Sequence, residues 1–161
     1  MLATPPMSAP APHRLLFVCT ANICRSPMAE ELARLYAARR GWWVEARSAG
    51  THARSGDDAA PNSQRAIKDL DGDLTQHKSQ PMSAELVAWA DRILVMELRH
   101  AQLVRAEFPE ADSKVQLLGT FGGMMELGDP YGSWIFKYRS SRDDIRRSVE
   151  GLLDRMPPRV R

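Results

Sequence analysis

Short apolar runs alternate with segments of helical periodicity along most of the chain. Residues 15–18 (Leu-Leu-Phe-Val) form a continuous apolar run, which is typical of a strand buried on both faces of a parallel sheet. Strands are predicted over residues 15–18, 42–48, 92–96 and 115–118, and helices over residues 26–40, 60–70, 83–89, 97–106 and 142–156. This alternation predicts an α/β domain with a parallel sheet, right-handed crossovers and helices on both faces.

The helical segments carry apolar residues at positions that would face the sheet. These positions are Leu98, Leu103 and Val104 in the fourth helix and Ile145, Val149, Leu152 and Leu153 in the fifth. The fourth helix leaves His100 on the surface by this pattern. Trp42 and Trp43 are expected in the core because of the area they bury. Residues 119–128, rich in glycine and methionine, are predicted to be a mobile loop.

One stretch between the first strand and the first helix is predicted to bind an anion. It reads Val-Cys-Thr-Ala-Asn-Ile-Cys-Arg-Ser-Pro, residues 18–27. Ser26 is a good N-cap, and Pro27 is favoured as the first helical residue. The loop amides then point at a helix N-terminus, where unpaired N–H groups and a partial positive charge favour an anion such as phosphate.

Cys19 and Arg25 stand at the two ends of this loop, with five residues between them. A thiol near a helix N-terminus and a guanidinium has a stabilised thiolate, which is the nucleophilic form. Arg25 can bind two phosphoryl oxygens as a planar fork, and the Ser26 hydroxyl is placed to donate to the Cys19 sulfur. The spacing therefore predicts a nucleophile, a phosphate clamp and an anion cradle in one loop.

The loop resembles the signature of the low-molecular-weight protein tyrosine phosphatase family, a Cys, five residues, Arg and Ser. Pro-Met-Ala-Glu at 27–30, Ser-Ala-Gly-Thr at 48–51, Ala-Asp-Arg-Ile-Leu-Val-Met at 90–96 and Asp-Pro-Tyr at 129–131 strengthen the resemblance. It implies a three-layer fold over residues 14–158, with a four-stranded parallel sheet of flavodoxin-like (phosphotyrosine phosphatase I) topology.

The resemblance also implies hydrolysis of phosphotyrosine through a phosphocysteine on Cys19, with Arg25 as clamp and Asp129 as general acid and base. The substrate would be a phosphotyrosine protein, with a bacterial tyrosine kinase as one candidate. Tyr131 is expected along the substrate ring. The predicted phosphate- and substrate-binding residues are Thr20, Ala21, Asn22, Ile23, Cys24, Ser26 and Tyr131.

Three loop positions carry further expectations. Asn22 is expected to brace the loop, because Asn tolerates left-handed geometry and can bond nearby backbone. Ala21 stands where the family usually has glycine, which costs roughly 1 kcal/mol if the backbone there needs a positive φ. Cys24 is either a redox partner that forms a reversible disulfide with Cys19 or a small buried side chain, and both interpretations stay open.

Two other segments are expected near the loop. Residues 52–55 (His-Ala-Arg-Ser) have no aromatic side chain where tyrosine phosphatases of the family usually place one wall of the phenyl slot. Bacterial relatives that act on kinases of capsule export also lack that wall. Arg54 is interpreted as a solvated loop residue. His77 is expected to support the loop by hydrogen bonds rather than to act in catalysis.

Three alternative functions share this loop. Protein arginine phosphatases have the Asp-Pro-aromatic-Gly pattern found at 129–132, but they typically carry threonine in place of Ile23. A thiol-linked arsenate reductase needs further cysteines, and this chain has only the two in the loop. A non-catalytic phosphate-binding module is disfavoured because Cys19, Arg25, Ser26 and Asp129 are present together. The tyrosine phosphatase is therefore preferred.

Composition narrows the class of protein. The length of 161 residues suits one domain, and a net charge of +2 gives no reason to expect nucleic acid or an acidic membrane as partner. Two cysteines in one loop fit a reducing cytoplasm. Residues 1–13, rich in Pro and Ala, are predicted to be a disordered tail, and no stretch reaches the ~18 apolar residues of a membrane span. The mechanism calls for no metal or other cofactor.

Overall fold

Strand β1 (His13–Cys19) lies inside a four-stranded parallel sheet in the computed structural model, which describes residues 9–161. The order is β2-β1-β3-β4, the flavodoxin-like arrangement. The other strands are β2 (Val44–Gly50), β3 (Arg92–Val95) and β4 (Val115–Leu117). The predicted α/β fold with a four-stranded parallel sheet is thus confirmed.

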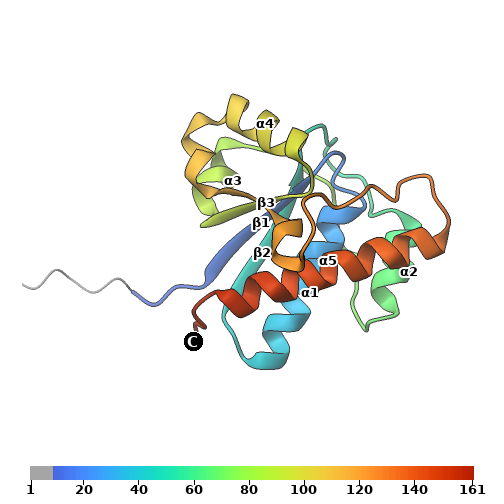
Figure 1. Ribbon diagram of the computed structural model, residues 1–161, viewed down its shortest axis with the longest axis horizontal. Helices are drawn as coiled ribbons and strands as arrows, with labels where there is room; N and C mark the ends of the chain where they lie inside the picture. Colours follow the sequence, from blue (N-terminus) through green and yellow to red (C-terminus); the bar gives the residue numbers. More distant parts are fainter. Residues whose placement is uncertain (1–8) are drawn as a thin grey trace, which may run out of the picture.

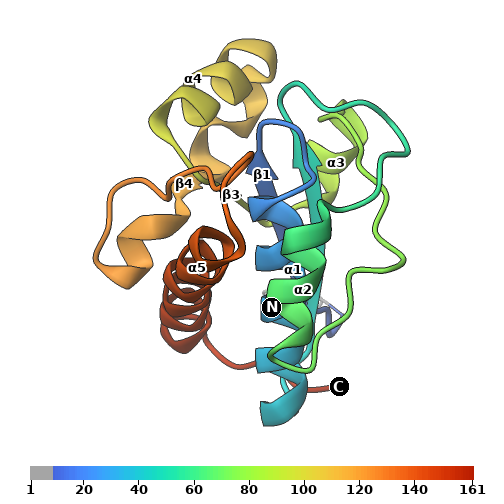
Figure 2. The same cartoon turned by 90° about the vertical axis from the view of Figure 1, so that its right-hand side faces the viewer.

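Alternate residues of β1 enter two different cores. Leu15 and Phe17 pack with residues of α1 and α5, whereas Leu16 and Val18 pack with residues of α3 and α4. Because successive side chains of a strand point to opposite faces, helices are needed on both sides of the sheet. All four side chains are fully buried. Figures 1 and 2 show the resulting three layers.

The helices divide between the faces as the cores require. On one face lie α1 (Arg25–Arg40) and α5 (Ile135–Arg155), with α2 (Pro61–Lys68) packed against both, and on the other lie α3 (Ala84–Trp89) and α4 (Leu98–Glu107). Ser83 caps α3 by accepting a hydrogen bond from the Leu86 amide, as its position predicts. Gly41 ends α1 in the left-handed conformation with φ 68°. None of the helices within residues 9–161 is long and apolar enough to cross a membrane.

The sheet register brings several strand ends to one edge. Cys19 pairs with Gly50 of β2, and Val18 pairs with Val95 of β3. The segments that follow these residues therefore leave the sheet side by side. In a parallel α/β sheet this carboxyl edge is where ligands bind.

The helix boundaries depart from the predicted ones at the first and last helices. Helix α1 begins at Arg25, with Cys24 at its N-cap and no side-chain cap, so the prediction of Ser26 as N-cap was wrong. Ser26 is fully buried and contacts the Cys19 sulfur instead. Helix α5 begins at Ile135, seven residues earlier than predicted, and Tyr138 in this added part is buried.

Some predicted burial was also wrong. Leu98 and Leu103 of α4 are 45% and 40% exposed, whereas His100 is fully buried. Both ring nitrogens of His100 have hydrogen-bond partners, which is what allows its burial, and the two leucines lie on the outward side of the helix. Strand β2 starts two residues later than predicted, and Trp42 and Trp43 are half-buried at its entrance. Trp42 still packs against the core and edge-on to Tyr36 of α1, as predicted. The inward positions predicted for α5 are confirmed.

Two segments predicted to lack regular structure each contain part of a regular element. Residues 118–122 form a short 3-10 helix (Leu118–Gly122) at the start of the segment predicted to be a mobile loop. Of the predicted disordered tail, residues 1–8 lie outside the described residues, and β1 already begins at His13.

Candidate phosphate site

The segment of residues 20–24 joins β1 to α1 at the carboxyl edge of the sheet (Figure 2). Asn22 has φ 57°, so the left-handed position of the loop falls on a residue that tolerates it. Ala21 does not have a positive φ, so the strain expected there is absent. The end of β2 packs closely on this loop, because a Cβ on Gly50 would clash with the Thr20 carbonyl oxygen.

The Asn22 side chain fixes the loop from within. Its Oδ1 accepts a hydrogen bond from the Gln80 amide at 3.0 Å, so its Nδ2 faces the hydroxyls of Ser26 and Ser48, at 2.8 and 2.9 Å. The Asn22 carbonyl oxygen lies 2.7 Å from His77 Nε2, which confirms the prediction that His77 supports the loop. Asn22 is fully buried and therefore acts as a brace.

Cys19 is nearly buried, at 3% exposed, and its sulfur lies 3.0 Å from Ser26 Oγ. Asn22 donates to the same hydroxyl oxygen, so the Ser26 hydrogen is left to point at an acceptor. The near acceptor is the sulfur, since the Ala49 carbonyl is 3.5 Å away. Ser26 therefore donates to the Cys19 sulfur, as its position in the loop predicts.

Arg25 is held so that one edge of its guanidinium is already occupied. Its side chain is 1% exposed, and Nη1 donates to Glu97 Oε2 at 2.7 Å and to the Leu127 carbonyl at 2.8 Å. Nη2 lies 3.7 Å from Asp129 Oδ2. Nε has no hydrogen-bond partner within residues 9–161, although it is buried. A buried N–H donor without a partner is costly, so the Nε edge suits an incoming anion.

Glu97 is the carboxylate that anchors this guanidinium. Burial disfavours its charge, but hydrogen bonds from Arg99 and Arg25 outweigh burial and lower the pKa of Glu97. Glu97 is not among the residues predicted from the sequence. Its place directly after the strand of residues 92–95 could have revealed it, because functional groups gather at the carboxyl ends of parallel strands.

Asp129 and Tyr131 lie on the segment that precedes α5. The Asp129 side chain is 44% exposed, and its Oδ1 accepts a hydrogen bond from the Tyr131 amide at 3.0 Å. Tyr131 itself is 68% exposed. Asp129 is thus near Arg25 in space although the two are far apart in sequence.

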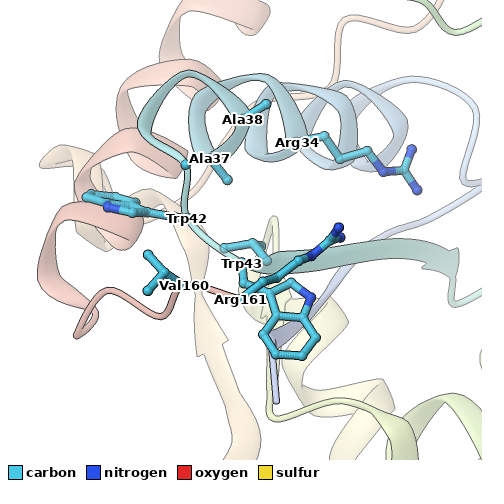
Figure 3. A pocket seen from close by; sticks show the side chains of 9 residues that line it. Arg34, Ala37, Ala38, Trp42, Trp43, Val160 and Arg161 are labelled. Carbon is cyan, nitrogen blue, oxygen red and sulfur yellow. The ribbon is translucent and has the colours of Figure 1, made fainter. Parts of the chain in front are cut away.

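A cavity of about 520 Å³ unites most of the predicted residues. It is lined by Cys19, Thr20, Ala21, Ile23, Cys24, Arg25, His52, Arg54, Asp57, Asp129 and Tyr131. Asn22 and Ser26 are absent from the lining because both are buried behind the loop. A second cavity, of about 480 Å³, lies where α1 turns into β2 and is lined by Arg34, Trp42, Trp43 and Arg161 among others (Figure 3). It contains none of the predicted residues.

The low molecular weight phosphotyrosine protein phosphatase model matches residues 14–160. The chain belongs to this family. The match spans the loop of residues 20–24, Asp129 and all of the sheet except its first residue, His13, so it includes the cavity at the carboxyl edge.

Relatives within the low molecular weight phosphatase family carry two different names. The protein-arginine-phosphatase of Geobacillus stearothermophilus is 35% identical over 147 residues, which are 90% of this chain and 97% of the relative. The low molecular weight protein-tyrosine-phosphatase Wzb of Salmonella typhi is also 35% identical, over 89% of this chain and 88% of the relative. The solved low molecular weight protein tyrosine phosphatase of T. tengcongensis superposes with a TM-score of 0.86 at 29% identity, over 89% and 99% of the two chains. The chain is therefore a phosphatase of this family, and identity alone favours neither substrate.

Cys24 lines the same cavity as Cys19, but its surroundings differ from those of Cys19. It is 4% exposed, and its sulfur is 3.6 Å from the Tyr138 hydroxyl. Burial raises the pKa of the Cys24 thiol to about 11. Cys19 and Cys24 are both free thiols in the structure. At neutral pH Cys24 is therefore protonated, and the nucleophile is better placed at Cys19.

Proposed function

We propose that the chain is a protein tyrosine phosphatase that hydrolyses phosphotyrosine through a phosphocysteine intermediate. The observation that carries the proposal is the convergence of the Cys19 sulfur, the Arg25 guanidinium and the Asp129 carboxylate on one cavity. A nucleophile, a charge clamp and a proton donor are the three groups that cleavage of a phosphate ester needs.

In the first step, the Cys19 thiolate attacks phosphorus, and the bond from phosphorus to the tyrosine oxygen breaks. The loop amides and the free Nε edge of Arg25 bind the non-bridging oxygens, whose charge they balance. Asp129 gives its proton to the leaving phenolate oxygen. In the second step, Asp129 removes a proton from water, which attacks the phosphocysteine and releases phosphate and the thiolate.

Two residues of the cavity wall support an aromatic substrate. Ile23 is half-buried and presents an apolar side chain to the cavity, and Tyr131 extends an exposed ring from the Asp129 segment. A phenyl ring can pack against both, whereas the polar guanidinium of phosphoarginine leaves its N–H groups unpaired against Ile23. Ile23 is also the residue on which the sequence favours a tyrosine phosphatase, because protein arginine phosphatases typically carry threonine there.

A second candidate is a protein arginine phosphatase. Two curated relatives at 35% and 36% identity carry that name. The cavity also has two carboxylates in its lining, Asp57 and Asp129, which suit a cationic guanidinium. The same Cys19 chemistry would then cleave a phosphorus–nitrogen bond in place of a phosphorus–oxygen bond.

We further propose Cys24 as a redox partner of Cys19. Oxidation of Cys19 by a peroxide gives a sulfenic acid, and condensation with the Cys24 thiol forms a disulfide and releases water. Two free thiols in one site persist best in a reducing compartment, so we place the phosphatase and its phosphoprotein substrate in the cytoplasm. A bacterial tyrosine kinase stays one candidate substrate.

The test compares kcat/KM for phosphotyrosine and phosphoarginine peptides of the same sequence, with Cys19→Ser as the inactive control. We expect a preference for phosphotyrosine, and we expect Ile23→Thr to reduce that preference. A preference of the wild type for phosphoarginine would establish the second candidate. If both peptides bind but neither is hydrolysed, the chain is a phosphate-binding module instead.

A further inference from the structure

The hydroxyl of Thr20, the first residue of the loop, lies between two side chains of α4. Its Oγ1 is 2.8 Å from His100 Nε2 and 3.0 Å from Arg99 Nη2. A guanidinium can only donate, so Thr20 accepts a hydrogen bond from Arg99. The direction of the contact with His100 depends on which ring nitrogen carries the hydrogen.

The backbone amide just before α4 shows which nitrogen carries the hydrogen. The Glu97 amide donates to His100 Nδ1 at 3.1 Å, so Nδ1 holds a lone pair. The ring is fully buried, and burial together with the charge of Arg25 lowers the pKa of His100 to about 4. The ring is therefore neutral at pH 7, and its hydrogen is on Nε2. His100 donates to Thr20.

The oxygen of Thr20 thus accepts two hydrogen bonds and must still direct its own hydrogen. Within residues 9–161, the hydrogen-bond partners of Thr20 Oγ1 are His100 Nε2 and Arg99 Nη2, which both donate, so its own hydrogen is left without an acceptor there. Thr20 lines the cavity with Cys19 and Arg25. His100 and Arg99 therefore hold the Thr20 side chain in one position at the rim of the anion site, with its hydroxyl hydrogen available to a ligand.

We propose that the Thr20 hydroxyl donates a hydrogen bond to a non-bridging oxygen of the bound phosphoryl group, and that His100 and Arg99 are its positioning residues. The proposal rests on the proposed function and adds a side-chain contact to the amides of the same site. Glu97 links the two ends of the loop, since its carboxylate holds Arg25 and its amide holds the His100 ring. Glu97 and the first turn of α4, which follows it, therefore orient a donor at each end of the cradle.

The decisive comparison is Thr20→Val, which removes the hydroxyl at nearly constant volume, against Thr20→Ser, which keeps it. For Thr20→Val we expect kcat/KM on the preferred phosphopeptide to fall about 10- to 100-fold, the usual range for a hydrogen bond to a charged group. The Ki of inorganic phosphate should rise by a similar factor. Thr20→Ser should recover most of both losses. Thr75→Val is the matched control, because Thr75 is exposed and its hydroxyl contacts Asp73.

A double-mutant cycle tests the positioning role of His100. His100→Leu should weaken phosphate binding when it is made in the wild-type background. In the Thr20→Val background it should cause little further loss of binding, because both changes remove the same contact. His100→Gln, whose amide can replace Nε2 as donor, should recover part of the loss. Additive losses in the cycle would assign His100 a structural role only and overturn this part.

Two results would overturn the Thr20 contact itself. One is a Thr20→Val variant with wild-type kcat/KM and Ki, and the other is a loss of kcat/KM at an unchanged phosphate Ki. If Thr20→Val does not fold, as judged by its thermal unfolding, Thr20→Ala provides the same comparison. A wild type that binds phosphate through Thr20 but hydrolyses neither peptide would refute the proposed function and leave this contact intact.

Discussion

The two groups proposed to break the phosphate ester lie in opposite surroundings. Cys19 is 3% exposed, and its loop is fixed by buried and partly buried hydrogen bonds from other parts of the chain. The Asp129 side chain is 44% exposed, and its Oδ1 is bonded to an amide only two residues away. The nucleophile is thus part of the folded core, whereas the acid lies on a surface segment.

This difference follows from what each group has to do. A thiolate is stabilised by fixed donors, which must be built into the fold before substrate arrives. An acid that alternates between protonation states exchanges protons with the leaving group and with water, so it has to be accessible. Changes in the loop should therefore affect both stability and activity, and changes at Asp129 should affect activity alone.

The largest effect is expected for Arg25→Lys. Lysine keeps the charge, but it cannot hold Glu97 and the Leu127 carbonyl while presenting a second edge to phosphate. We expect kcat/KM on phosphotyrosine peptide to fall about 10³-fold, as for loss of a key electrostatic donor. Arg105→Lys, at an exposed ion pair with Asp112, is the matched control and should be near wild type. A loss below tenfold would show that the planar fork is not needed.

Asp129→Asn should lower activity without lowering stability. We expect kcat to fall about 10²-fold because the leaving oxygen loses its proton donor. The loss should shrink for an aryl phosphate whose phenol is more acidic, since that leaving group needs less protonation. Urea unfolding should give a free energy of unfolding within about 0.5 kcal/mol of the wild type, as for an exposed position. A larger drop in stability would break the contrast between the two regions.

Asn22→Ala should lower stability on the loop side. The change removes hydrogen bonds to Ser26, Ser48 and Gln80 and places a Cβ residue at φ 57°. We expect the free energy of unfolding to fall by about 2–3 kcal/mol in urea titrations. Asp71→Ala is the control, because Asp71 is exposed and has φ 64°, so it tests backbone strain alone. Equal losses in the two variants would mean that the Asn22 hydrogen bonds contribute nothing.

The parts of the fold that could be predicted rest on local signals. The apolar run of β1, the glycine at the end of α1 and the spacing from Cys19 to Arg25 are properties of neighbouring residues, and the structure places all three as expected. Asp129 was predicted only through the family resemblance, because nothing local distinguishes an acid from a turn residue.

The parts that could not be predicted depend on contacts between distant elements. Ser26 is suited to an N-cap by its residue type, but in the structure its hydroxyl is hydrogen-bonded to the Cys19 sulfur and to the Asn22 side chain. His100 stands among polar residues in a surface helix, and only the fold reveals that Thr20 and the Glu97 amide surround it. Burial of a polar side chain follows from partners that come from elsewhere in the chain.

His100 gives the last and smallest prediction, a pH dependence of stability that arises on the loop side alone. Its pKa is lowered to about 4 in the folded protein by burial and by Arg25, from an ordinary value of 6.5, so the unfolded chain binds the proton more tightly. Above about pH 6.5 the imidazole is neutral in both states, and the full stability of the folded protein is present. As the pH falls from 6.5 toward 4, the unfolded chain takes up a proton that the folded protein does not, so the free energy of unfolding falls. Between pH 7 and pH 5 this linkage amounts to about 2 kcal/mol.

The measurement is urea unfolding at pH 7 and pH 5 for the wild type and His100→Gln. Glu30 acts in the opposite direction, because burial raises its pKa to about 7 and its neutral form suits the folded state at pH 5. Both proteins contain Glu30, so the difference between them isolates the imidazole. We expect the wild type to lose about 2 kcal/mol more than His100→Gln on acidification. Equal losses of unfolding free energy in the two proteins would place the pKa of His100 near its ordinary value. The imidazole that holds Thr20 would then be accessible to water, and the contrast between a buried loop and an exposed Asp129 segment would not extend to His100.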